Sequence, residues 1–401
     1  MRIGFDVSQT GKAKAGCGYF ADGLIRQLAA TDTRNEYILY PAVGDFFWDP
    51  ACKQETFACQ EPNFQRLDPP RDFPASQQFW RNPPADFEAR LGHPDIFHAN
   101  NFFCPRSLKN ARLVYTTYDL SFLQEPKWTT EENRIGCLHG VFEASIRADW
   151  ILAISEFTRR HFLDTFPHYP RERSSVIYPA SRFPDSLPAL RSERLAMLES
   201  ARFWLSVGTI EPRKNHRSLL EAYSRLRSAM GSAYPLVLAG GRGWLMEAFL
   251  DDLRSLELGR DVILTGYVSD AELKWLYQNC FAFVYPSLFE GFGMPVLEAL
   301  GLGAPVLCSN TSSLPEAAGD AAVLFDPSDP LSIAKEMIRF ARGEVGRESL
   351  QSAGLEQAKK FSWARSAARL LELYEQVVAS PRMAAIPAPG GGGGGAIQAR
   401  A

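Results

Sequence analysis

Two glutamates, Glu290 and Glu298, are separated by seven residues in a segment that predicts a ligand site. Apolar residues 281–285 predict a strand, and Pro295 suits the first turn of a helix, where its missing N–H costs nothing. The intervening loop therefore ends at a helix N-terminus. Free N–H groups and the positive end of the helix dipole favour an anionic or hydroxyl-rich ligand there.

The glycines of this loop support the same interpretation. Gly291 and Gly293 flank Phe292, and glycine permits close backbone approaches that a side chain forbids. Because Glu290 precedes the helix and Glu298 lies about one turn inside it, we expect the two carboxylates to face different parts of one ligand. The alternative is a simple strand-loop-helix connection with solvated glutamates.

Two adjacent cations, Arg213 and Lys214, follow the predicted strand 203–208 at the start of another helix. The helix dipole prefers acidic residues in that turn, so the cations indicate an anion opposite them. A diphosphate is the obvious candidate, since Arg clamps it bidentately and Lys acts as a point charge. The alternative is a pair of solvated surface cations.

Two further loops are weaker candidates. Gly16 and Gly18 follow the first strand and begin a helix, but they lack the third glycine of the dinucleotide fingerprint. Tyr267 and Val268 follow the strand 262–265, where backbone groups would read a nucleobase edge while Tyr267 packs against the base. Either loop is equally compatible with plain turn chemistry.

The elements that must position these residues are short strands alternating with helices in both halves, which predicts two doubly wound α/β domains. The segment 42–92 interrupts this pattern as a long irregular insertion, of a kind that is often functional. The expected strands cover residues 2–8, 37–40, 96–99, 113–117, 150–154 and 175–178, then 203–208, 236–239, 262–265, 281–285, 305–308 and 322–325.

We expect domains at 1–185 and 201–362, with a linker at 186–200. An amphipathic helix at 363–380 is expected to pack back on the first domain. Residues 381–401 contain six consecutive glycines and are predicted to be disordered. The carboxyl ends of both sheets should then face a shared cleft, the expected active site.

Composition excludes several classes of protein. The 401 residues are 46% hydrophobic and 22% charged, with a net charge of −3 that leaves no basic nucleic-acid footprint. No apolar run spans a bilayer, and the first seven residues predict a strand with no signal-peptide features, so we expect a cytoplasmic protein. Seven cysteines without a C-x-x-C pair and six scattered histidines predict reduced thiols, no metal site and no cofactor.

The motifs together resemble the family 4 glycosyltransferases over nearly the whole ordered chain. The resemblance implies the GT-B fold, two Rossmann-like domains facing each other across a cleft. It also implies that Glu298 would bind the ribose of a nucleotide sugar, that Glu290 and the backbone of 291–294 would hold the sugar, and that Arg213 and Lys214 would hold the diphosphate. Such enzymes retain anomeric configuration and usually need no metal. The other assigned donor-binding residues are Gly16, Gly18, Tyr267, Val268, Gly291, Phe292, Gly293 and Met294.

One position departs from the family pattern. Relatives commonly have His-Asp where this chain has Tyr118 and Asp119, which we assign with Glu290 to catalysis. A phenol is a poorer cation and proton acceptor near neutral pH. We therefore expect either that Tyr118 binds the sugar or acceptor by hydrogen bonding or that activity is low. His98 ends a strand and either reaches the cleft or is an ordinary buried histidine.

The segment 208–215 is most similar to bacterial mannosyltransferases that build surface polysaccharides such as O-antigen, capsule or exopolysaccharide. This predicts a hexosyltransferase that uses GDP-mannose and a saccharide or lipid-linked saccharide acceptor. Peripheral contact with the inner membrane follows from a lipid-linked acceptor and from residues such as Phe79, Trp80 and Arg81.

Three other functions are weighed against this prediction. Tyr118 motivates a non-catalytic nucleotide-sugar binding protein. A nucleotide-sugar epimerase of the same fold is disfavoured by the complete glutamate loop, and a glycosidase, which also uses two carboxylates, has no need of Arg213 and Lys214.

Overall fold

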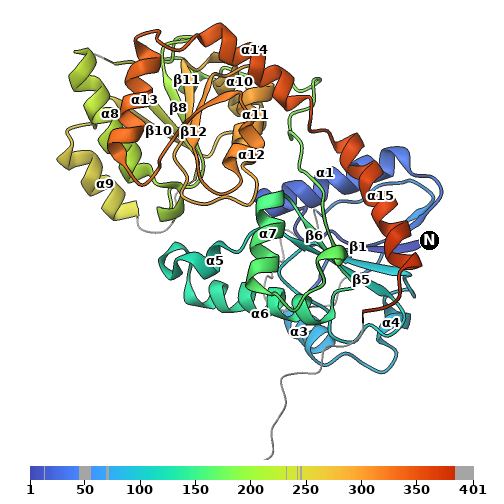
Figure 1. Cartoon of the computed structure of the whole chain (residues 1–401). Helices are drawn as coiled ribbons and strands as arrows, with labels where there is room; N and C mark the ends of the chain where they lie inside the picture. The colour runs from blue at the N-terminus through green and yellow to red at the C-terminus, as the bar shows by residue number, and fades with distance from the viewer. Residues whose placement is uncertain are drawn as a thin grey trace, which may run out of the picture.

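The computed structural model describes residues 1–12, 14–44, 56–68, 72–231, 233–241, 243 and 246–383. These residues form two domains, each built on its own parallel sheet (Figure 1). The prediction of two doubly wound α/β domains is therefore confirmed.

The first sheet has the order β3-β2-β1-β4-β5-β6-β7 within the described residues. Its central strands are buried on both faces, as the continuous apolar runs predicted. The strands are β1 (Arg2–Asp6), β2 (Glu36–Tyr40), β3 (Phe64–Arg66), β4 (Ile96–Ala99), β5 (Arg112–Thr117), β6 (Trp150–Ala153) and β7 (Ser174–Val176).

Helices cover both faces of this sheet. The helical elements of the first half of the chain are α1 (Gly16–Thr31), α3 (Phe73–Arg81), α4 (Phe87–Arg90), α5 (Ser121–Gln124), η1 (Pro126–Trp128), α6 (Glu131–Arg147), α7 (Glu156–Thr165) and η2 (Arg171–Arg173).

The second sheet has the order β10-β9-β8-β11-β12-β13. Its strands are β8 (Trp204–Val207), β9 (Leu236–Ala239), β10 (Val262–Gly266), β11 (Ala282–Tyr285), β12 (Val306–Ser309) and β13 (Ala322–Phe325). The remaining helical elements are η3 (Glu193–Leu195), η4 (Pro212–Lys214), α8 (His216–Met230), α9 (Met246–Ser255), α10 (Asp270–Asn279), α11 (Met294–Gly301), α12 (Leu314–Ala318), α13 (Pro330–Ala341), α14 (Arg347–Ala358) and α15 (Trp363–Ala379).

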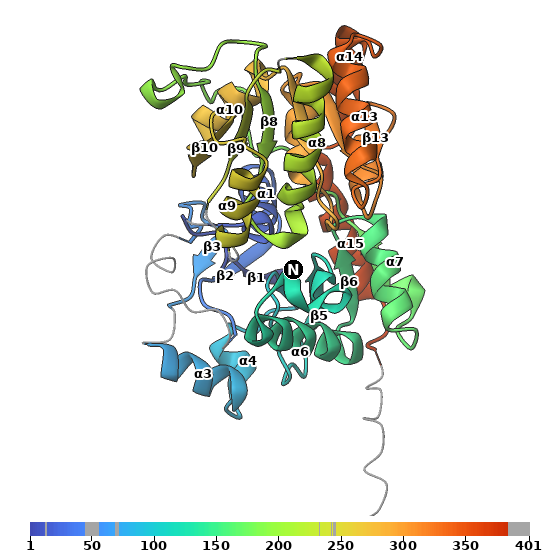
Figure 2. The same ribbon diagram turned by 90° about the vertical axis from the view of Figure 1, so that its left-hand side faces the viewer.

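The segment 42–92 is more regular than expected. Where described, it contributes the edge strand β3 and the helices α3 and α4, which lie on the part of the first domain remote from the second (Figure 2). Asp72 caps α3 by accepting a hydrogen bond from the Ala75 N–H at 2.9 Å. Trp80 is only 3% exposed and Phe79 is half-buried, so the aromatic residues predicted to meet a membrane are mostly covered.

The last helix, α15, belongs to the core of the first domain. It packs on α1, where Gly23 leaves room for the ring of Trp363, and its Leu370 and Tyr374 join the same hydrophobic cluster as Phe5 of β1. The chain therefore crosses between the domains twice, once after β7 and once before α15 (Figure 1).

His98 lies inside this core and does not reach the cleft. Its Nδ1 is 2.5 Å from the Tyr374 hydroxyl of α15, and its Nε2 is 2.8 Å from Thr116 Oγ1. Burial lowers the pKa of His98 to about 3. The histidine is a neutral structural link between β4 and the returning helix.

The two boundary segments also pack on the domains. In the segment after β7, the Leu187 carbonyl accepts a hydrogen bond from Lys274 of α10 at 2.7 Å. Disorder was predicted from 381 onward, but Arg382 donates to the carbonyl groups of Lys109 and Ala111, and the Met383 N–H donates to Asp149 at 3.0 Å. Those first three residues are fixed, while the glycine run at 390–395 lies outside the described residues.

Candidate active site

The loop between β11 and α11 is pressed against the first domain. A Cβ on Gly291 would lie 2.0 Å from the carbonyl oxygen of Tyr118, so only glycine fits there. Gly293 has φ +99°, the left-handed region that favours glycine, and it caps α11. The two glycines thus let the loop approach the other domain and turn into the helix.

Glu290 lies at the centre of a charged cluster. Its carboxylate accepts hydrogen bonds from Lys214 Nζ at 2.5 Å, Ser287 Oγ at 2.6 Å and Tyr285 Oη at 2.9 Å. Arg213 Nη1 lies 3.1 Å from its other oxygen. Burial would raise the pKa of Glu290, but the charges of Lys214 and Arg213 outweigh it and lower the pKa to about 2.

The two cations are aimed at this loop by a bend in their own segment. Arg213 and Lys214 lie in the short turn η4, which precedes α8. The sequence pattern had predicted them at the start of the helix itself. Asn215 follows with φ +58° and donates to the carbonyl groups of Pro286 at 3.1 Å and Pro327 at 2.8 Å. These hydrogen bonds hold an unfavourable backbone conformation that directs the cations towards Glu290.

Glu298 is paired with a cation that sequence reasoning missed. Its Oε1 lies 3.1 Å from Arg182 Nε, and the Tyr277 hydroxyl donates to its Oε2 at 3.3 Å. Arg182 comes from the segment after β7 and lies over the ring of Tyr19, 4.5 Å from its centroid. Burial raises the pKa of Glu298 to about 7, although Arg182 partly opposes the shift.

Tyr118 and Asp119 follow β5 in the first domain, and the Tyr118 side chain is bonded within that domain. Burial lowers the pKa of Arg213, but the charges of Glu290 and then Asp119 raise it well above its usual value. The Asp119 carboxylate itself accepts hydrogen bonds from the N–H and the hydroxyl of Ser121, at 2.9 and 2.7 Å. The buried Tyr118 hydroxyl donates to the Asn100 carbonyl at 3.0 Å, and the ring packs edge-on against Phe20. Tyr118 meets the loop through its main chain.

Of the remaining assigned residues, Phe292 is buried and Met294 half-buried in the loop and the helix start that follow Glu290, whereas four others lie outside this loop. Gly18 is a packing glycine, because a Cβ there would lie 2.1 Å from the Gln9 carbonyl oxygen. Gly16 is exposed at the start of α1, with open space around it. Tyr267 is 73% exposed, whereas Val268 is buried. The exposed pair suits ligand contact better than the buried pair.

Contacts between the domains add residues that no local pattern indicates. Glu316 of α12 accepts hydrogen bonds from the N–H groups of Glu156 at 2.8 Å and Phe157 at 3.1 Å, the first residues of α7. Ser155 and Thr158 donate to the Gly291 carbonyl at 2.5 and 2.9 Å. Together they fix the loop against the first domain.

Comparisons with known proteins match both domains. Residues 192–360 match the family model described as glycosyl transferases group 1, and residues 21–180 match glycosyltransferase family 4. O-antigen chain mannosyltransferase B of Escherichia coli is 35% identical over 318 residues, which cover 74% of this chain and 82% of that protein. This chain belongs to the family 4 glycosyltransferases.

Other relatives of this glycosyltransferase are consistent with the assignment. The serotype-specific mannosyltransferase WbdA of Escherichia coli is 35% identical over 241 residues, 58% of this chain but 29% of that protein. O-antigen chain mannosyltransferase RfbU of Salmonella typhimurium is 28% identical over 186 residues, 46% of this chain and 49% of that protein.

Solved structures confirm the predicted GT-B fold of the glycosyltransferase. Sucrose-phosphate synthase from Thermosynechococcus elongatus has a TM-score of 0.70 at 19% identity, covering 94% of this chain and 99% of that one. Anabaena HepE in complex with UDP and glucose has a TM-score of 0.68 at 17% identity, covering 94% and 100%. Within the described part of the chain, none of the helices combines the length and apolarity needed to cross a membrane.

Proposed function

We propose that this glycosyltransferase moves mannose from GDP-mannose to a saccharide or lipid-linked saccharide, with retention of configuration, in the synthesis of a bacterial surface polysaccharide. The cluster of Glu290, Arg213 and Lys214 at the domain boundary carries the proposal. The similarity to O-antigen chain mannosyltransferase B over most of both chains supports the choice of mannose.

The diphosphate is proposed to bind Arg213 and Lys214 beside the N-terminus of α11. Departure of the nucleoside diphosphate builds negative charge, and fixed donors aimed at such charge are worth about 3 to 4 kcal/mol each. Because both cations already lie within 3.1 Å of Glu290, the diphosphate and the sugar held by Glu290 would be adjacent. Bond cleavage would then occur between them.

Glu290 is proposed to accept hydrogen bonds from the sugar hydroxyl groups and Glu298 from the ribose. Glu298 is buried beneath the half-buried Arg182, so the ribose reaches Glu298 only if Arg182 moves or shares the carboxylate. Asp119 is proposed to contact the transferred sugar from the first domain. Tyr118 is proposed to act through its carbonyl group, which sets the position of Gly291.

The acceptor is proposed to enter on the face from which the diphosphate leaves, which retains the anomeric configuration. A Glu290 carboxylate held by two cations is a weak nucleophile, so we propose direct transfer to the acceptor within the cleft, without a divalent metal. The enzyme would act in the cytoplasm, with peripheral membrane contact where the acceptor is lipid-linked.

A donor screen tests the proposal. Purified protein is incubated with GDP-mannose, UDP-glucose, UDP-galactose or UDP-N-acetylglucosamine and a mannose oligosaccharide, and nucleotide release and product are quantified. GDP release with an α-linked product is expected from GDP-mannose. Turnover of UDP-sugars without turnover of GDP-mannose would overturn the choice of donor, and an inverted product would overturn retention.

The non-catalytic alternative makes a different prediction. It requires donor binding by calorimetry without transfer to any acceptor, with activity restored by Tyr118→His. The named relatives are transferases, and this similarity favours neither the non-catalytic binding protein nor the epimerase. Sedimentation with anionic vesicles tests membrane contact, and the protein should pellet with them if the acceptor is lipid-linked.

A further inference from the structure

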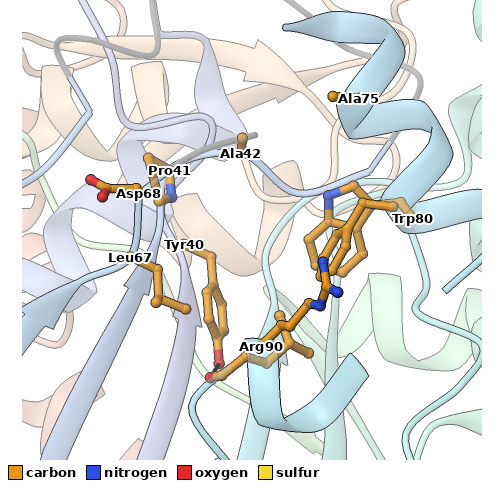
Figure 3. A pocket seen from close by; sticks show the side chains of 10 residues that line it. Tyr40, Pro41, Ala42, Leu67, Asp68, Ala75, Trp80 and Arg90 are labelled. Atoms are coloured by element: carbon orange, nitrogen blue, oxygen red, sulfur yellow. Dashed lines mark hydrogen bonds between the residues drawn. The ribbon is translucent and has the colours of Figure 1, made fainter. Parts of the chain in front are cut away.

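A cavity of about 340 Å³ lies in the first domain, outside the cluster around Glu290. It is enclosed by the segments that follow β2 and β3 and by the helices α3 and α4 (Figure 3). Its volume is near the lower end of the range for small-molecule sites, about 300 to 1,000 Å³. Its lining includes Tyr40, Leu67, Asp68, Phe79, Trp80 and Arg90.

Trp80 lines this cavity and carries an unpaired donor. The side chain is 3% exposed, and within the described part of the chain its indole N–H has no hydrogen-bond partner. Edge contacts with Phe87 at 5.6 Å and Phe103 at 5.5 Å between ring centroids hold the ring in place. An unsatisfied buried donor costs about 1 to 3 kcal/mol, so a ligand that accepts this N–H would recover that energy.

The other walls combine apolar surface with charge. The Tyr40 hydroxyl is bonded to the Leu91 carbonyl at 2.8 Å, so this side chain offers its ring to the cavity. Figure 3 shows Tyr40, Leu67 and Asp68 on one side and Trp80 with Arg90 on the other. The Arg90 guanidinium is held at 3.0 Å by Asp86 through Nε, and its side chain stays 58% exposed.

This mixture suits a sugar ring. A pyranose has apolar C–H faces that pack on aromatic rings, and hydroxyl groups that accept an indole N–H and donate to a carboxylate. A lipid chain would leave the indole N–H without a partner and would make no use of the charges of Asp68 and Arg90. The chemistry of the lining therefore favours a saccharide.

Part of the cavity lining lies at the edge of the sheet that also carries Asp119. Pro41 and Asp68 follow the carboxyl ends of β2 and β3, and Asp119 follows that of β5. Strands β1 and β4 lie between β2 and β5, so three strand spacings, about 14 Å, separate the two points along the edge. One sugar unit does not span that distance, whereas a short oligosaccharide does.

Building on the proposed function, we propose that this cavity binds a sugar unit of the acceptor remote from the unit that is extended. The enzyme then recognises an oligosaccharide chain and extends longer acceptors more efficiently than single sugars. This preference for longer acceptors depends on Asp68, Trp80 and Arg90. Changes at these residues leave donor binding unaffected.

The test compares Trp80→Phe, which keeps a ring but removes the N–H, with wild type on mannose acceptors from the monosaccharide to the pentasaccharide. Wild-type kcat/KM should rise with acceptor length, and Trp80→Phe and Asp68→Ala should each reduce that rise about tenfold. The KM for GDP-mannose should stay unchanged. Trp150→Phe is the matched control, because it removes a buried indole N–H that bonds Ser175 at 3.1 Å elsewhere on the sheet.

Several results would overturn the proposed role of the cavity without contradicting the proposed transferase function. These are a wild-type rate indifferent to acceptor length, an equal loss for monosaccharide and pentasaccharide in Trp80→Phe, or an equal effect of Trp150→Phe. If kcat/KM for alkyl mannosides rises with alkyl chain length, and this rise is lost in Trp80→Phe, the cavity binds the lipid part of the acceptor instead.

Failure of the proposed function gives a different result, namely no transfer from GDP-mannose to any acceptor. Calorimetric titration with mannopentaose then tests saccharide binding by the cavity independently of transfer. Weaker binding by Trp80→Phe than by wild type and Trp150→Phe supports it, and equal affinities overturn it.

Discussion

At the scale of single residues, the site depends on charges removed from water. Glu290 is ionised because two cations and two hydroxyl groups surround it, and the same cations are the groups proposed to receive the diphosphate. Glu298, one turn into the helix, has a single cation and a raised pKa. The pKa values of two carboxylates with seven residues between them are therefore shifted in opposite directions.

Replacing Glu290 with Gln should lower kcat about 10²- to 10³-fold while the protein stays folded, because the amide cannot balance Arg213 and Lys214. Steady-state kinetics with GDP-mannose measure the change. Glu211→Gln is the control, since Glu211 pairs with Arg213 at 2.8 Å but lies outside the loop. Full transfer activity in Glu290→Gln would refute the role proposed for this carboxylate.

Glu298 should make stability fall as the pH rises. The folded chain keeps the Glu298 proton up to a pKa of about 7, whereas the unfolded chain releases it near the ordinary glutamate pKa of 4.5. Between these values the native state binds more protons, so this group's contribution to the free energy of unfolding falls by about 1.4 kcal/mol per pH unit. Urea unfolding across this range should show that decline reduced in Glu298→Gln, and parallel profiles would contradict it.

At the scale of elements, helix α7 begins on a carboxylate from the other domain. Glu316 accepts hydrogen bonds from two N–H groups that an isolated helix would leave to water. The loop that carries Gly291 is bonded to the same helix start through Ser155 and Thr158. One helix N-terminus thus couples the domains beside the candidate site.

Removing the Glu316 carboxylate as Glu316→Ala should cost about 1 kcal/mol and favour an open arrangement of the domains. Small-angle scattering of the free protein should show a larger radius of gyration. The exposed Glu348, in the first turn of α14, provides the control variant Glu348→Ala. A radius unchanged from wild type would show that Glu316 does not hold the domains together.

Sequence patterns predicted the strands that are buried on both faces and most of the edge strands, but they missed the edge strand β3. Central strands such as β4 and β9 are continuous apolar runs, whereas β3 is three half-exposed residues with a polar centre. Residue spacing within one segment revealed Glu290, Arg213 and Lys214. Arg182 and Glu316 were missed because their contacts join segments more than a hundred residues apart.

Tyr118 shows a further limit of local pattern. The residue type and its place after β5 were visible in the sequence, but the direction of the side chain depends on Phe20 and Asn100, which come from other elements. Packing between elements decides that rotamer, and no local pattern encodes it.

At the scale of the whole molecule, the close approach of the two domains depends on Gly291. Gly291→Ala should push the loop away from Tyr118, because its Cβ would lie 2.0 Å from a carbonyl oxygen. We expect a roughly tenfold or greater loss of kcat/KM, since small misplacements at an active site are costly. Gly259→Ala is the control, as nothing lies within 4 Å of its Cβ position. Equal activity of both variants would place Gly291 outside the closure contact.

The first domain should also depend on α15. A chain ending at Phe361 loses the buried side chains of α15, of which the largest are Leu370, Leu373, Tyr374 and Val377. Burial of each large aliphatic side chain contributes about 1.5 to 3 kcal/mol. Calorimetry should then show loss of the first domain's transition while the second domain still unfolds cooperatively. Tyr374→Phe, which removes only the hydroxyl near His98, should cost about 1 kcal/mol. Two intact transitions in the shortened chain would contradict this.

Because the chain crosses between the domains twice, the two domains complete their cores at different times during translation. The second domain is contiguous, so its core is complete as soon as α14 has left the ribosome, whereas the first domain still lacks the helix that covers β1 and β4. The domain translated first is therefore finished last. During that interval the apolar surface around Phe5 and Ile96 lacks the cover of α15, and such transiently exposed surface is prone to aggregation.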